Sequence, residues 1–132
     1  MKIRFGKKED LKELIELDKE SSREINWWAS MKKSEFLELI REKRIFVAEE
    51  KKKIIGYLSS EIRNKKIILD GIYVRRDFRN KNVANMLIKK FLSDLEKSKY
   101  KEVRLNCPEK LIKFYEKFGF KKIRIIMRKK IK

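Results

Sequence analysis

A chain of 132 residues, with 42% hydrophobic residues, 44% charged residues and a formal net charge of +18, fits one domain, residues 1–132, and argues against two domains or a disordered segment. Its single cysteine, Cys107, and the absence of histidine exclude an internal disulfide and the usual histidine-containing zinc and catalytic-triad sites. We expect no signal peptide, and the sequence has no apolar run of the ~20 residues that a membrane span needs. We therefore expect a cytoplasmic protein without a metal ion.

The first part of the chain changes between a β pattern and two helical patterns. Polar and apolar residues alternate over Lys2–Phe5, which predicts a first strand. Asp10 stands at the expected N-cap of one helix, and Ser34 at that of a second. Residues 21–31 lack a helical period, so we expect a loop or an irregular helix there.

The middle of the chain has the pattern of β structure. Residues 45–48 and 54–62 and the segment Lys66–Val74 are apolar or β-rich runs separated by short charged turns. Gly56 lies inside the second run, where a bulge is common. Three strands at such short spacing predict an antiparallel meander.

The last part of the chain returns to alternating helices and strands. An apolar residue at every fourth position from Val83 to Leu95 predicts an amphipathic helix. A strand over 100–107 and a helix that ends at Gly119 are expected next. We predict that residues 120–131 finish as one or two short strands.

These elements define a fold class. Strands that follow one another through a helix need a crossover, so the sheet cannot be purely antiparallel. We predict an α/β (α+β) fold in one domain, with a mixed, mostly antiparallel twisted sheet of about six or seven strands flanked by about four helices.

The stretch 69–87 combines an apolar strand, a basic turn and a helix start at Val83. The N-terminus of a helix presents unpaired backbone N–H groups and the positive end of the helix dipole to an anion. Arg79 and Lys81 add positive charge to this turn. The pattern therefore predicts a phosphate-binding turn.

Three stretches of the chain share their pattern with one known family. Residues 72–74, read as IYV, and 79–84, read as RNKNVA, look like a strand and a pyrophosphate turn of the form Arg or Gln, two residues, Gly, one residue, then Gly or Ala. Residues 114–120, read as FYEKFGF, are similar to a late helix with Tyr followed after three residues by Gly-Phe, and 127–129 look like a final strand. In these patterns and in element order the chain resembles the GNAT superfamily of acyl-CoA-dependent N-acetyltransferases.

The resemblance has two departures. The family's glycine falls on Asn82, and the family's Asn near the start of the last helix has no counterpart, because the loop at Cys107 and Pro108 is one residue shorter. Asn tolerates a left-handed backbone better than other non-glycine residues. We therefore expect Asn82 either to form the tight turn or to cap the helix.

The resemblance implies a GNAT-type acyltransferase that uses acetyl-CoA as cosubstrate and no metal ion. The pyrophosphate is expected on the backbone N–H groups of residues 80–84, and the pantetheine along the strand at 72–74. The predicted cofactor-binding residues are Ile72, Tyr73, Val74, Arg79, Asn80, Lys81, Asn82, Val83 and Ala84.

Acetyl transfer to an amine needs a base for the amine and a proton for the departing thiolate. Tyr115 matches the family's proton donor, although packing on a helix face is its alternative role. Asp70 is one candidate base, and it shares a strand face with Ile72 and Val74 if no bulge intervenes. Glu61 on the preceding strand is the other candidate, and either carboxylate could act through water.

The expected acceptor is a primary amine, on a protein N-terminus, a lysine or a small molecule, in a direct ternary complex. Trp27 and Trp28 fall where the family's variable early helices cover the acceptor site, so we predict substrate contact there. A protein of net charge +18 repels polycationic acceptors unless it has an acidic cleft. The early acidic cluster that could form one comprises Glu16, Asp18, Glu20 and Glu24.

The positive charge leaves an alternative function open. A basic nucleic-acid or ribosome-associated binding module on a GNAT-like scaffold, with weak or no acetyltransferase activity, would explain the basic residues after 120. A thermophile-like composition explains the charge equally well, because both signs are interspersed over most of the chain. We expect no membrane partner, and either a monomer or a homodimer.

Overall fold

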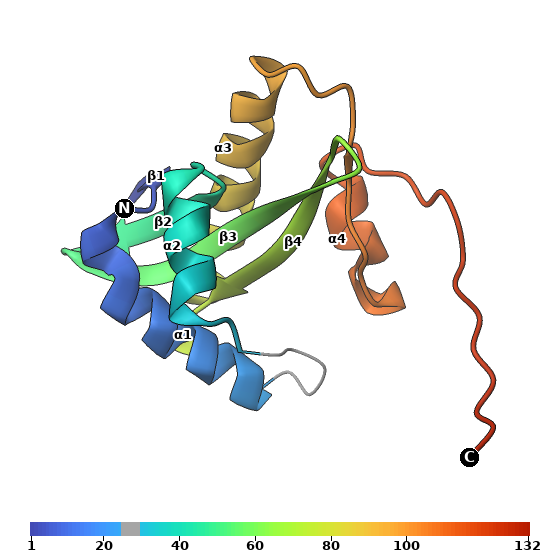
Figure 1. Ribbon diagram of the computed structural model, residues 1–132, viewed down its shortest axis with the longest axis horizontal. Coiled ribbons are helices and arrows are strands. Elements are labelled where there is room, and N and C mark those ends of the chain that lie inside the picture. Colours follow the sequence, from blue (N-terminus) through green and yellow to red (C-terminus); the bar gives the residue numbers. More distant parts are fainter. Residues whose placement is uncertain (25–29) are drawn as a thin grey trace.

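The structure is a computed structural model that describes residues 1–24 and 30–132. Within these residues the strands form one five-stranded sheet in the order β1-β2-β3-β4-β5 (Figure 1). The elements are β1 (Lys2–Phe5), η1 (Lys8–Asp10), α1 (Leu11–Glu24), α2 (Lys33–Arg41), β2 (Ile45–Glu50), β3 (Lys53–Arg63), β4 (Lys66–Val74), η2 (Arg76–Phe78), α3 (Val83–Glu96), β5 (Val103–Arg104), η3 (Glu109–Leu111) and α4 (Ile112–Glu116).

The sheet is mixed, as the sequence predicts. Strands β1 to β4 pair as antiparallel neighbours, because short turns connect β2, β3 and β4. Strand β5 pairs with β4 in parallel, because α3 carries the chain back before β5 begins. The predicted α/β class, single sheet and four helices are confirmed, whereas the described residues form five strands and not six or seven.

Helices cover both faces of the sheet and bury a core on each (Figure 1). On one face the apolar stripe of α3, which includes Leu87 and Phe91, packs with Leu58 of β3. On the other face Leu14 of α1 and Phe36 of α2 lie in a separate core cluster. All of these side chains are at most 3% exposed, which explains why the helical periodicities were readable from the sequence.

The predicted terminal β structure at 120–131 is wrong for the single chain. Residues 120–132 contain no strand, and Ile123 and Met127 are 66% and 90% exposed. A β pattern becomes a strand only when a neighbouring strand accepts its backbone hydrogen bonds. Among the described residues, the last such bond from the body to this segment is that from the Phe120 N–H to the Tyr115 carbonyl, at 3.4 Å.

No helix in the described part of the chain is both long and apolar enough to cross a membrane. Residues 1–24 and 30–132 also contain no cluster of three or more His, Cys, Asp or Glu side chains that could hold a metal ion.

A buried carboxylate connects α1 to the sheet and to the chain that precedes α2. Asp18 of α1 is 1% exposed. Its Oδ2 accepts a hydrogen bond from the Met31 N–H at 2.6 Å, and its Oδ1 accepts one from the Tyr57 hydroxyl at 3.1 Å. Asp18 thus holds the chain at Met31, just after the segment that carries Trp27 and Trp28.

Replacing Asp18 with Ala leaves the buried Tyr57 hydroxyl and the part-buried Met31 N–H without this acceptor. We expect the free energy of unfolding to fall by about 2–3 kcal/mol, measured by urea denaturation. Glu16→Ala is the matched control, because Glu16 lies on the exposed side of the same helix, and it should change stability by less than about 0.5 kcal/mol. Equal losses in the two variants would contradict this role of Asp18.

Candidate functional site

The turn between β4 and α3 has a left-handed backbone at two asparagines. Asn80 has φ 63° and Asn82 has φ 67° with ψ 14°. Asn82 occupies the N-cap position of α3, but its side chain caps no backbone N–H; its Oδ1 accepts from the side-chain amide of Asn85 instead. Of the two expected roles, Asn82 therefore has that of the left-handed turn residue.

This turn leaves the first backbone N–H groups of α3 available to a ligand. The N–H of Met86 is the donor that bonds to the Asn82 carbonyl, at 3.1 Å, so the N–H groups of residues 83–85 precede the helical ladder. The first turn contains no acidic residue. Lys81 is exposed, and its Nζ lies 5.4 Å from the centroid of the Phe78 ring. A positive helix end without a carboxylate fits a diphosphate.

Arg79 points toward the protein and supports the turn from within. Its Nε donates to the carbonyl oxygen of Val74 at 3.0 Å. Its two Nη atoms donate to the two carboxylate oxygens of Glu24, at 2.6 and 2.8 Å. The guanidinium also lies 5.3 Å from the centroid of the Tyr73 ring. Arg79 therefore connects the end of β4 to the end of α1.

Glu24 is a site residue whose role the sequence did not reveal. Besides the two bonds from Arg79, its Oε2 accepts a hydrogen bond from the Tyr73 hydroxyl at 2.9 Å, and Arg76 lies 3.9 Å from its Oε1. The hydrogen bond from Arg79 lowers the pKa of Glu24 to about 2. The sequence identified Glu24 only as one member of the early acidic cluster, because its partners are about fifty residues further along the chain.

The second half of β4 has an open edge. β5 pairs with β4 only at Ile67 and Ile68. Along 69–74 no strand of the described chain pairs with β4 on this side, while β3 pairs on the other side. An extended ligand can hydrogen-bond such an edge as an added strand would. After β4 ends at Val74, η2 (Arg76–Phe78) precedes the turn at Asn82.

A bulge interrupts β4 at Asp70. Ser59 of β3 lies opposite Gly71, and the next residue, Ser60, lies opposite Leu69. Asp70 is therefore the extra residue on β4. The expectation that Asp70 shares a strand face with Ile72 and Val74 depended on the absence of a bulge.

The bulge moves Asp70 to the other face of the sheet from Ile72 and Val74. Before the bulge Leu69 belongs to the core cluster under α3, and after it Ile72 and Val74 pack against that same cluster. Tyr73, which has the parity of Leu69, lies in the cluster under α1 and α2. The expected shared face is thus wrong, because one inserted residue reverses the alternation of the strand.

Asp70 and Glu61 influence one another electrostatically. Asp70 is exposed, yet the protein atoms around its carboxylate raise its pKa, and the negative charge of Glu61 raises it further. Glu61 is half-buried and forms a 3.0 Å ion pair with Arg63. A carboxylate with a raised pKa is the better general base near neutral pH.

Tyr115 of α4 is 6% exposed. Its ring makes edge contacts with Phe114 and Phe120, with centroids 5.1 and 5.8 Å apart. Burial raises the pKa of its hydroxyl, and Cys107 adds to the effect. The Tyr115 hydroxyl is therefore protonated at neutral pH. This protonation state fits both a proton donor and a packed core residue.

Two buried polar atoms without a hydrogen-bond partner in the described chain lie beside this site. They are Ser59 Oγ, opposite the bulge, and Asn85 Oδ1, in the first turn of α3. Buried polar groups are nearly always paired with protein, water or ligand. Asn85 lies in the first turn of α3, where a polar ligand would supply the missing partner, whereas Ser59 lies on β3, on the side of β4 away from the open edge.

The early acidic cluster does not form a single cleft. Asp18 is buried and Glu24 binds Arg79, whereas Glu16 and Glu20 line a separate cavity of about 220 Å³ that also includes Arg75. Trp27 and Trp28, the predicted substrate contacts, lie outside the described residues.

The sequence model of one family, described as "Acetyltransferase (GNAT) domain", matches residues 16–130. No curated protein sequence matches the chain.

Solved structures share the fold over most of the chain. The aminoglycoside N-acetyltransferase AAC(6')-Iy, in complex with CoA, superposes with a TM-score of 0.75 at 21% identity over 98% of this chain and 98% of its own. Ard1 from Thermoplasma volcanium has a TM-score of 0.75 at 21% identity over 90% of this chain and 81% of its own. Glucosamine-6-phosphate N-acetyltransferase from Arabidopsis thaliana has a TM-score of 0.70 at 24% identity, over 99% of this chain and 98% of its own. At these identities the similarity establishes the fold.

Glu24→Gln should lower the free energy of unfolding at neutral pH by about 0.5–1 kcal/mol, since the ion pair with Arg79 is partly exposed. The pKa of Glu24 falls on folding from 4.5 to about 2. Its contribution is thus complete above pH 4.5 and is lost as the pH falls toward 2. Urea denaturation of wild type and variant over this range measures the difference, with Glu16→Gln as control. A stability difference that does not depend on pH would rule out the ion pair as its source.

Proposed function

Because this chain belongs to the family of GNAT acetyltransferase domains, we propose that it transfers the acetyl group of acetyl-CoA to a primary amine in a direct ternary complex. One observation carries the proposal. The left-handed turn at Asn82 sets the free N–H groups of α3 at the end of a strand whose outer edge is open. This arrangement fits a ligand with a diphosphate at one end and an extended amide chain at the other.

The residues of the turn and the open strand fit acetyl-CoA. The N–H groups of residues 83–85 would bind the pyrophosphate, with Lys81 close by as a counter-charge. The backbone of 72–74 would pair with the amides of the pantetheine. Arg79 would hold the turn in shape through Val74 and Glu24 and would not act as a direct phosphate ligand. When bound, acetyl-CoA supplies a thioester with an electrophilic carbonyl carbon and a thiolate leaving group.

The two faces of the sheet would serve the two proton transfers. Asp70, directly or through water, would take a proton from the ammonium group of the acceptor, so that the nitrogen can form the new C–N bond. Tyr115 would donate its hydroxyl proton to the sulfur as the C–S bond breaks. The second proton, which the nitrogen loses as the amide forms, would pass through water and restore the Tyr115 hydroxyl. Asp70 lies on the face of α1 and α2, and Tyr115 packs on the face of α3. In this proposal the thioester would lie at the open edge of β4, between the two faces.

The acceptor would enter from the side of α1 and α2. The solved relatives are named for aminoglycosides and glucosamine-6-phosphate, which carry amines. For this chain we propose the same chemical class, a primary amine on a small molecule, a protein N-terminus or a lysine. The divided acidic cluster and the charge of +18 disfavour long polycations. The segment with Trp27 and Trp28 is proposed to contact the acceptor.

Tyr115→Phe should lower kcat at least about 100-fold and leave the Kd for acetyl-CoA nearly unchanged, because only the proton donor is lost. A screen of small-molecule and peptide amines first identifies an acceptor. The rate at which free CoA thiol is released with this acceptor gives kcat, and calorimetry gives the Kd for acetyl-CoA. Tyr100→Phe is the control, since Tyr100 also packs on this core. Unchanged turnover in Tyr115→Phe would show that Tyr115 is not the proton donor and only packs in the core.

The choice between Asp70 and Glu61 can be made from the pH dependence of kcat/KM for the amine. If Asp70 is the base, Asp70→Asn lowers kcat/KM and abolishes the decline on the acidic side. Glu61→Gln removes a negative charge that raises the pKa of Asp70, so the acidic decline should move to lower pH with activity retained. Loss of activity in Glu61→Gln and a normal profile in Asp70→Asn would assign the base to Glu61.

A further inference from the structure

Ser59 of β3 carries a hydroxyl group that has no hydrogen-bond partner among the described residues, although Ser59 is only 1% exposed. A buried hydroxyl nearly always has a partner in protein, water or ligand. The side chains across the ladder cannot be that partner, because Ser59 lies opposite Ile45 of β2 and Gly71 of β4. The partner of this hydroxyl must therefore come from elsewhere.

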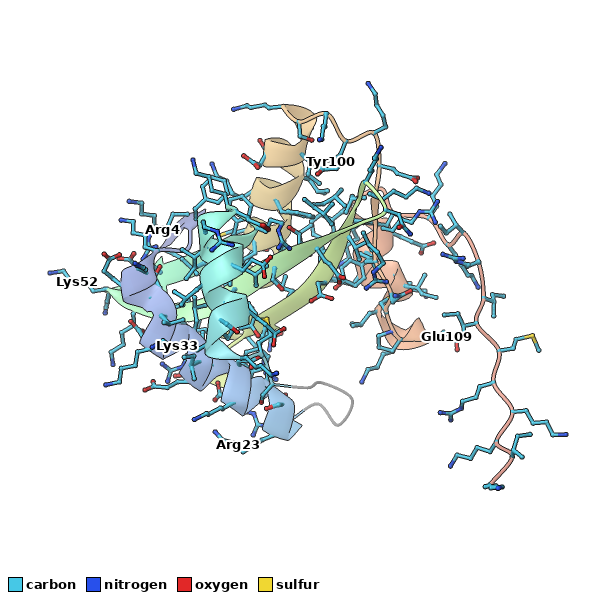
Figure 2. All side chains as sticks on the ribbon, in the orientation of Figure 1. Arg4, Arg23, Lys33, Lys52, Tyr100 and Glu109 are labelled. Carbon is cyan, nitrogen blue, oxygen red and sulfur yellow. The ribbon has the colours of Figure 1, made fainter. Side chains whose placement is uncertain are left out.

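Ser59 faces the side of the sheet that α1 and α2 cover. Along β3, the residues Tyr57, Ser59 and Glu61 are two positions apart and so share one face of the strand. Tyr57 belongs to the core cluster that includes side chains of α1 and α2. Helix α2, whose first residue Lys33 is labelled in Figure 2, lies over this face.

The bulge of β4 brings Asp70 next to Ser59. Asp70 is the inserted residue that directly precedes Gly71, the residue opposite Ser59. Because the bulge moves Asp70 to the face of α1 and α2, its carboxylate and the Ser59 hydroxyl lie on the same face. A bulge also leaves the backbone of the inserted residue unpaired in the ladder. A hydroxyl, a carboxylate and unpaired backbone groups thus meet at one place.

The electrostatics of the neighbouring side chains agree with this position. Burial raises the pKa of the Tyr57 hydroxyl, and the charges of Asp18 and Asp70 raise it further. The protein atoms around its carboxylate, and then the charge of Glu61, raise the pKa of Asp70. Asp70 is therefore within electrostatic range of Tyr57 and Glu61, the residues on either side of Ser59 along this face.

A water molecule fits between the Ser59 hydroxyl and the Asp70 carboxylate. A buried water typically makes about three hydrogen bonds to polar groups. The hydroxyl, the carboxylate and an unpaired backbone group of the bulge would supply these three. Gly71 adds no side chain to this place, so it does not compete for the position of the water.

We infer that Ser59 is a positioning residue, which holds the carboxylate of Asp70 in place through one bound water. The inference rests on the proposed function, in which Asp70 takes a proton from the ammonium group of the acceptor. Asp70 lies on β4, between the open edge of that strand and Ser59 on β3. The water donates a hydrogen bond to the carboxylate oxygen on the side of Ser59, so that the other oxygen is directed toward the acceptor.

The water also affects how Asp70 responds to pH. The titratable and charged groups around Asp70 come from β3, from α2 and from the residue before β2: Tyr57, Glu61, Arg63, Glu35 and Arg44. None of these groups changes when the Ser59 hydroxyl is removed. A hydrogen bond donated to a carboxylate favours its charged form, so loss of the water should raise the pKa of Asp70.

The side-chain carboxyl ¹³C shift of Asp70, followed against pH, tests the inference without acetyl transfer. Ser59→Ala should raise the pKa of Asp70 above the wild-type value. Ser60→Ala is the matched control, because Ser60 is also buried, at 4% exposed, but its hydroxyl donates to the Arg44 carbonyl at 3.5 Å. It should leave the pKa of Asp70 unchanged. An equal pKa of Asp70 in wild type and Ser59→Ala, or an equal rise in both variants, would overturn the inference.

The pH dependence of kcat/KM for the amine tests the link to catalysis. Since the base must be deprotonated, the acidic decline in Ser59→Ala should begin at higher pH than in wild type, opposite to the shift expected for Glu61→Gln. At neutral pH kcat/KM should fall about 10-fold, because the carboxylate is no longer oriented. A raised pKa of Asp70 without this shift of the decline would show that Ser59 positions no base.

Failure of the proposed function has a different result. If wild type transfers acetyl groups to no amine, the proposed function fails, whereas the titration of Asp70 still decides whether Ser59 holds its carboxylate. If transfer is found and the pKa of Asp70 is the same in wild type and Ser59→Ala, the proposed function stands and the inference about Ser59 fails.

Discussion

The left-handed backbone at Asn82 is the constraint on which the candidate site depends. It turns the chain into α3 at the end of the connection, residues 75–82, that follows β4. A β-branched or bulky residue would strain this conformation, whereas Asn tolerates it and Gly adopts it freely. Asn82 thus replaces the glycine that the family pattern has at this position without losing the turn.

The ion pair between Glu24 and Arg79 supports that turn and connects it to the opposite side of the site. Arg79 holds the carbonyl of Val74 at the end of β4, and Glu24 ends α1, immediately before the segment with Trp27 and Trp28. Glu24 and Arg79 therefore connect the turn to the end of α1.

Much of the fold and the turn at Asn82 could be predicted from the sequence, and the features that could not be predicted have a common cause. The meander and α3 were readable because their apolar residues recur with the period of one element, and Asn82 because its left-handed tendency is local. The bulge at Asp70, the partner of Glu24 and the missing terminal strand depend on which segments meet in space. A single inserted residue moved Asp70 to the other face, and the strand pattern after residue 120 lacks a neighbour in the single chain.

In the proposed function, the turn before α3 binds the pyrophosphate of acetyl-CoA. Backbone amide chemical shifts of the ¹⁵N-labelled protein, recorded while CoA is added, test this most directly. We expect the amides of residues 80–85 to show the largest changes with CoA and to change little with pantetheine, which lacks the pyrophosphate. The amides along the open edge of β4 should respond to both ligands. Binding of CoA that leaves the amides of 80–85 in place would contradict it.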